Sequence, residues 1–113
     1  MAAYPEVREE SIELEGEKFA VYFMELENAV VGFFYDRGVL RLGTLAFALP
    51  SGFQPAALGT STVLVGHRNA GVSRILAEYM ATAKGKIALA SVALSKEDLK
   101  SGRVLLNLLK KVL

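Results

Sequence analysis

The segment from residue 61 to 94 constrains the fold most, because it places one amphipathic helix between two short apolar strands. Helical spacing relates its apolar residues Val72, Ile75, Leu76, Tyr79, Met80 and Ala83. Gly85 follows with Lys84 just before it, as is typical of a helix C-terminus. The predicted elements are a strand at 61–65, a helix at about 70–84 and a strand at 86–94.

Four stretches of high β propensity precede this segment, at 7–14, 18–26, 29–35 and 39–49. The second and third carry apolar side chains at both parities, so we expect both of their faces to be covered. Asp36-Arg37-Gly38 is typical of a hairpin loop, and the four strands are predicted to form an antiparallel meander. Gly43 is predicted to mark a bulge or a close approach.

The last helix is predicted from Ser95 to the end of the chain, with Asp98 placed three residues on as in a capping box. The order of elements predicts an α+β fold. One sheet of about six mostly antiparallel strands would carry two main helices. The length, 113 residues, indicates a single domain over 1–113. A second copy is the expected cover for any surface that the helices leave bare.

The apolar arc of the last helix spans roughly 200° of its circumference, more than one core-facing stripe needs. We expect Leu106, Leu109 and Leu113 in the core. Val104 and Leu108 flank them, and either contact a second protein or are covered within the domain. On the first interpretation, Leu108→Glu breaks a dimer and leaves the monomer folded.

Composition excludes several classes of function. The net charge of +1 shows no basic surplus for nucleic acid, and the absence of cysteine removes disulfides and thiolate sites. The apolar runs are too short to span a bilayer, and the first residues lack the pattern of a signal peptide. A cytoplasmic protein that binds neither membrane nor nucleic acid is expected. The 52% apolar content favours an interface with another protein.

The turn from Gly66 to Ser73 almost spells a phosphate-binding loop, but Val72 replaces the lysine that reaches the phosphates. NTP hydrolysis is therefore not predicted, although free N–H groups at the helix start can attract an anion. His67 is the only histidine, so the chain has no two-histidine metal site. We predict no catalytic residue, cofactor or metal. His67 and Arg68 are candidate partner contacts.

Two further groups of side chains have a structural interpretation. Glutamates of the first hairpin are predicted to keep an edge strand solvated. Aromatic residues on the strands are predicted to pack in the core; they are Phe19, Tyr22, Phe23, Phe33, Phe34, Tyr35 and Phe47. The loop at 50–60 carries Phe53, an exposed-looking side chain and a third candidate partner contact.

Two stretches resemble the small proteasome assembly chaperones of the type 3 and type 4 group. One is A-V-V-G-F-F-Y-D-R-G-V-L-R-L-G-T-L-A-F-A-L-P-S at 29–51, in which a hydrophobic strand turns into a strand containing G-T-L. The other, over 60–113, is T-S-T-V-L-V-G, a helix, K-I-A-L-A-S-V-A-L and a closing helix. Their joint order extends over roughly residues 12–113.

The resemblance implies a non-enzymatic dimer that binds proteasome α-subunits and assists assembly of the α-ring without ATP. It also implies a six-stranded, largely antiparallel sheet with flanking helices. A single chain of this kind looks like an archaeal-type homologue that pairs with itself. The sequence ends Lys111-Val112-Leu113 and lacks the tyrosine of hydrophobic-Tyr-X docking tails, so any contact is expected through the folded surface.

Two other functions remain open at this point. One is a regulatory module that binds a small ligand or anion at the turn from Gly66 to Ser73. The other is a dimeric scaffold of the same fold with an unrelated partner, since fold alone does not determine function.

Overall fold

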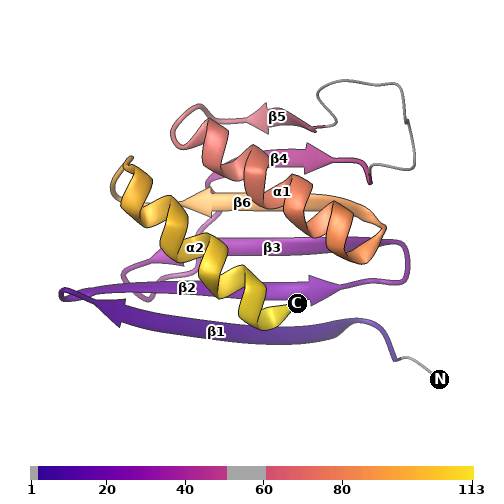
Figure 1. Cartoon of the computed structure of the whole chain (residues 1–113), viewed down its shortest axis with the longest axis horizontal. Coiled ribbons are helices and arrows are strands. Elements are labelled where there is room, and N and C mark those ends of the chain that lie inside the picture. Colours follow the sequence, from indigo (N-terminus) through magenta and orange to yellow (C-terminus); the bar gives the residue numbers. More distant parts are fainter. Residues whose placement is uncertain (1–2, 51–60) are drawn as a thin grey trace.

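The computed structural model describes residues 3–50 and 61–113 and shows one six-stranded mixed sheet with two helices (Figure 1). In chain order the elements are β1 (Glu6–Leu14), β2 (Glu17–Glu25), β3 (Ala29–Asp36), β4 (Thr44–Ala48), β5 (Ser61–Val65), α1 (Ala70–Lys84), β6 (Ile87–Ala93) and α2 (Leu99–Val112). The predicted α+β class and element order are confirmed. Four of the five strand pairs are antiparallel, whereas β3 and β6 are parallel.

The predicted four-stranded meander is wrong after its third strand. The order in the sheet is β1-β2-β3-β6-β4-β5, so β6 lies between β3 and β4. The turn at Arg37 and Gly38, both at positive φ, does not lead back along β3. Residues 37–43 instead cross to β4, and pairing resumes only at Thr44 rather than Val39. Each central strand therefore pairs with a partner distant in sequence.

Gly43 confirms the predicted close approach where the chain crosses the end of β6. Its N–H donates to Ser91 Oγ at 2.8 Å. A Cβ at this position would overlap the backbone oxygen of Val92 and lie 2.6 Å from Ala93 Cα. Only glycine fits between these backbones.

We therefore expect Gly43→Ala to lower the free energy of unfolding by about 1–3 kcal/mol, because backbone must move to admit the methyl group. Urea denaturation followed by circular dichroism measures the change. Gly71→Ala is the matched control, since a Cβ there meets nothing within 4 Å and its φ is not positive. Equal stability of the two variants would contradict the close approach.

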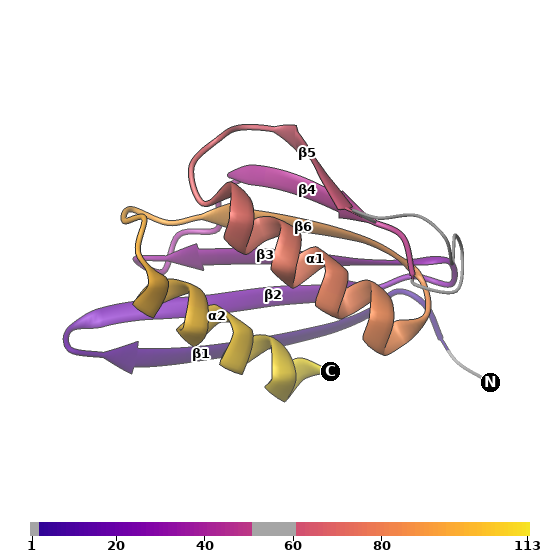
Figure 2. The same ribbon diagram turned by 45° about the horizontal axis from the view of Figure 1, so that its top comes forward.

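Both helices lie on the same face of the sheet and run side by side (Figures 1 and 2). α1 has its predicted bounds and ends at Gly85, whose N–H donates to the Ala81 oxygen at 2.8 Å. α2 begins later than predicted. Asp98 rather than Ser95 is its N-cap, and its carboxylate accepts from Ser101 N at 2.8 Å.

The core lies between the helices and one face of the sheet. Its largest fully buried side chains include Phe23, Phe34, Leu76, Met80 and Leu105. On both helices the buried stripe is rotated from the predicted one. Ile75 and Tyr79 of α1 are 57% and 39% exposed. Small residues of α1 pack on the sheet instead; they are Ser73, Ala77 and Ala81.

Buried Asp36 joins three segments at one end of the sheet. Its Oδ2 accepts from Ser95 N at 2.8 Å and from Ser95 Oγ at 2.6 Å. Its Oδ1 accepts from Arg41 Nη2 at 2.7 Å, and the same nitrogen donates to the Ala93 oxygen at 2.8 Å. The end of β3, the crossing segment and the link from β6 to α2 are thus fixed together.

Candidate functional site

The face of the sheet opposite the helices is the most extensive candidate site. Strand side chains alternate between faces, and one parity on β2, β3, β4 and β6 points away from both helices. Eight of these side chains, here called the open sheet face, are large, apolar or aromatic, and only partly buried. They are Tyr22, Met24, Val31, Phe33, Leu45, Phe47, Ile87 and Leu89.

The strand register brings these side chains into one continuous patch. Tyr22 pairs with Phe33, and their rings meet edge to face with centroids 6.4 Å apart. Val31 and Phe47 flank Leu89 from the two neighbouring strands. Contiguous apolar surface of this kind typically marks a site of protein association.

This arrangement corrects two sequence predictions. We expected both faces of β2 and β3 to be covered, but neither helix packs on the open sheet face (Figures 1 and 2). We also expected all the strand aromatics in the core. Phe19, Phe23 and Phe34 are buried there, whereas Tyr22, Phe33, Tyr35 and Phe47 lie on the other parity and remain partly exposed.

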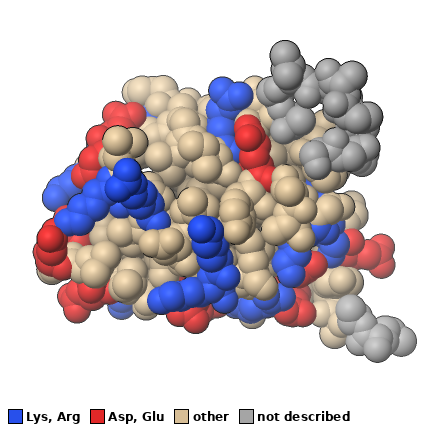
Figure 3. Space-filling view, viewed as in Figure 1, with Lys and Arg blue, Asp and Glu red and all other residues tan. Residues whose placement is uncertain are grey.

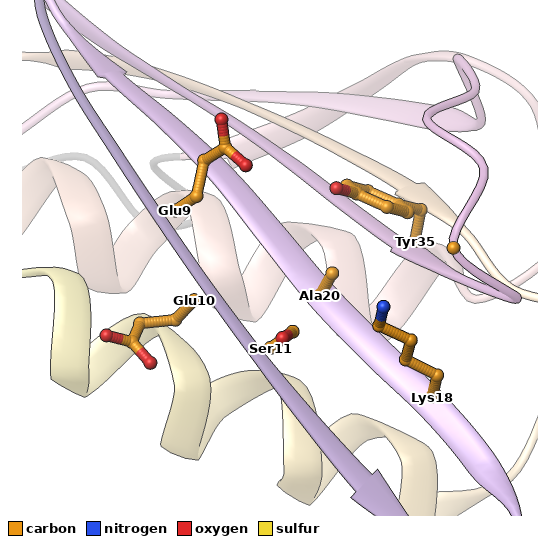
Figure 4. A pocket seen from close by; sticks show the side chains of 7 residues that line it. Glu9, Glu10, Ser11, Lys18, Ala20 and Tyr35 are labelled. Carbon is orange, nitrogen blue, oxygen red and sulfur yellow. The ribbon is translucent and has the colours of Figure 1, made fainter.

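A polar hollow of about 290 Å³ borders the open sheet face near the β1 edge (Figure 4). Glu9, Lys18 and Tyr35 line it, and Figure 4 shows Glu10 pointing to the opposite side of β1. Burial raises the pKa of the Tyr35 hydroxyl, and the nearby Glu9 charge adds to this rise. The apolar patch therefore has a charged margin, as protein interfaces commonly do.

The glutamates of the first hairpin lie on β1, on β2 and in the turn between them, and β1 is an edge strand of the sheet. The predicted solvated edge is confirmed, because most of β1 is exposed. Such charges discourage other strands from adding to this edge.

The turn before α1 holds the other predicted contact residues. His67 and Arg68 are exposed, and Arg68 Nη2 donates to the Ser95 oxygen at 3.1 Å. The N–H of Asn69 donates to Glu97 Oε2 at 2.9 Å. A carboxylate of the chain itself therefore already lies at the helix start, which weighs against an anion site there.

The structure places Val104 and Leu108 of α2 in the core, 8% and 1% exposed. They pack against the sheet, so the second interpretation is the right one: both side chains are covered within the domain. They are not available to a partner. Leu108→Glu would therefore place a charge in the core and destabilise the fold, rather than break a dimer. Leu106, predicted to be core, is only partly buried on the side of α2 that faces α1. Phe53 lies outside the described residues.

Within residues 3–50 and 61–113, no group of three or more His, Asp or Glu side chains is placed to hold a metal ion. In the same part of the chain, no helix has the length and apolar character needed to cross a membrane.

No protein-family model matches the sequence, and no curated protein matches it. The fold does match solved structures. One is a chain from a crystal structure described as a novel chaperone complex for yeast 20S proteasome assembly. The alignment covers 95% of this chain and 91% of that chain, with a TM-score of 0.66 and 14% sequence identity. The two chains share their fold across nearly their whole length.

Proposed function

We propose that this protein is a non-enzymatic assembly chaperone that acts as a homodimer, binds proteasome α-subunits and assists α-ring assembly. The open sheet face is the observation that carries the proposal. A chain of 113 residues that leaves eight large apolar or aromatic side chains only partly buried on one face of its sheet is suited to binding another protein. We infer the kind of partner from the fold that this chain shares with a chain of a chaperone complex for yeast 20S proteasome assembly.

Face-to-face packing of two open sheet faces is the geometry that we propose for the homodimer. Two sheets stack about 10 Å apart when their apolar faces interdigitate. The molecule extends 41 × 34 × 20 Å, and the sheet lies across the two longer dimensions. Its face is therefore large enough for the roughly 800 Å² per partner that a standard interface buries. The helices of both copies would remain on the outside.

Native mass spectrometry of the protein with the α-subunit of its own source organism tests this function. We expect a complex that contains two copies of this chain and forms without nucleotide. A homodimer that binds no α-subunit, free or in rings, would contradict the proteasome role and leave a dimeric scaffold with another partner. A monomer that binds the α-subunit would contradict the homodimer alone.

A further inference from the structure

A second apolar surface lies on the other side of the molecule, in a groove between the two helices. This helix groove has a volume of about 160 Å³. Its lining residues are Val72, Ile75 and Leu76 of α1 and Leu99, Gly102, Arg103 and Leu106 of α2. Arg103 is the one charged side chain among them, so the lining is apolar with a single cation.

The groove is open to solvent, although its floor is closely packed. A Cβ at Gly102 would lie 3.1 Å from Val72 Cγ2, so the Val72 side chain packs closely on the backbone of α2 there. Above this contact, Ile75 is 57% exposed and Leu99 is 79% exposed. Glycine inside a helix costs about 1 kcal/mol relative to alanine, and here it keeps the groove free of a side chain.

The two helices carry a surplus of positive charge. α1 and α2 together carry six cations, Arg74, Lys84, Lys100, Arg103, Lys110 and Lys111, and one carboxylate, Glu78. Lys84 and Lys100 form ion pairs with Glu25 and Glu15 outside the groove, whereas Arg103 lines it. The whole chain has a net charge of only +1, and six of its twelve acidic residues lie on β1 and β2. Figure 3 shows Lys and Arg side chains along α2, with uncharged surface between them and α1.

Two of these cations are placed to serve a bound partner. Among the described residues, Arg103 has no carboxylate within ion-pair distance. Lys110 Nζ lies 5.9 Å from the centroid of the Tyr79 ring, which continues the apolar surface along α1. A ligand in the groove would therefore meet apolar side chains below it and positive charge from α2 beside it.

We propose that the helix groove binds an acidic amphipathic helix of a partner protein. Helix-in-groove recognition uses apolar side chains spaced one turn apart, and the exposed Ile75 and Tyr79 stand one turn apart on α1. Acidic residues on the other sides of the ligand would match Arg103 and Lys110. This inference goes beyond the assembly function, since it depends on neither the open sheet face nor a proteasome subunit.

A synthetic peptide tests the proposal directly. The probe is a fluorescein-labelled 14-residue peptide with leucine at the a and d heptad positions and glutamate at the others. Fluorescence anisotropy with the whole protein should show binding at least tenfold tighter than for the same peptide with lysine in place of glutamate. Affinity should fall as salt is raised from 50 to 300 mM, because screening weakens exposed charge contacts.

Variants locate the site. Ile75→Glu and Arg103→Glu should each weaken binding of the glutamate peptide by at least tenfold. Val39→Glu is the control. Val39 is similarly exposed, at 53%, but lies on the crossing segment and does not line the helix groove. This substitution should leave binding unchanged.

Four results would each overturn the proposal. One is equal affinity for the glutamate and lysine peptides, which indicates apolar adhesion without charge selection. The second is no binding of the glutamate peptide, and the third is equal effects of the groove and control variants. The fourth is a change in the oligomeric mass of the peptide-free protein on Ile75→Glu, which would make the groove a contact between copies of this chain.

Discussion

Phe33→Glu should convert the proposed homodimer into a folded monomer. Phe33 lies on the open sheet face against Tyr22, and in a face-to-face dimer its ring would be covered by the second copy. A glutamate there would have to be desolvated without a partner, at a cost of several kcal/mol. The dimer dissociation constant should therefore rise by roughly 100-fold or more. Size-exclusion chromatography with light scattering measures it.

The neighbouring residue supplies the matched control. Phe34 has the same side chain but the opposite parity and is fully buried against the helices. Phe34→Glu should therefore unfold the protein, since it places a charge in the core. If Phe33→Glu leaves the dimer intact while Leu64→Glu on the β5 edge breaks it, the dimer forms through the strand edge and our geometry is wrong.

The local elements of this fold are predictable from sequence because their signals are local. Gly85 ends α1 in a left-handed conformation, as its position after Lys84 predicts. The pairing of β3 with β6 is different, because it joins residues more than fifty positions apart. Asp36-Arg37-Gly38 has the composition of a hairpin turn, and nothing in those three residues distinguishes a hairpin from a crossing of the sheet end.

The candidate site was only partly predictable, for a related reason. The high apolar content and the two-faced strands indicate that some apolar surface would need another cover. They do not determine which face of the sheet the helices cover. Ile75 and Ala77 show the difficulty on α1. Hydrophobicity alone places Ile75 in the core, yet the short side chain of Ala77 is what allows the helix to approach the sheet.

The same limit applies to α2. An apolar arc of roughly 200° is wider than the buried stripe. It therefore fixes the buried side of the helix only to within a rotation of one or two residues. The sheet selects the side with Leu105, Leu108 and Leu109, and leaves Leu106 to the groove. Contacts inferred from the flanks of an apolar arc therefore depend on a rotation that only the packed structure fixes.

Asp36→Asn should lower the free energy of unfolding by about 3 kcal/mol at pH 7, the cost of breaking a buried ion pair and its hydrogen bonds. Asp36 is 3% exposed and accepts from both Ser95 and Arg41. Loss of the carboxylate would leave Arg41 beside a neutral amide. It would also loosen the crossing segment that connects β3 to β4. Urea denaturation of both proteins measures the difference. Glu27→Gln, at an exposed turn, should change nothing.

The pH dependence of that difference in the free energy of unfolding separates the contribution of the carboxylate charge from that of packing. Burial raises the pKa of Asp36, but the hydrogen bonds from Ser95 and the nearby Arg41 outweigh it, so the pKa lies below its ordinary value of 3.8. The stabilisation is therefore fully present above the unfolded pKa and is lost as pH falls through the folded pKa. Wild type and Asp36→Asn should converge in stability at the acidic end of a pH 7 to pH 2 series. A gap that stays constant over that range would mean that shape rather than charge holds the three segments together.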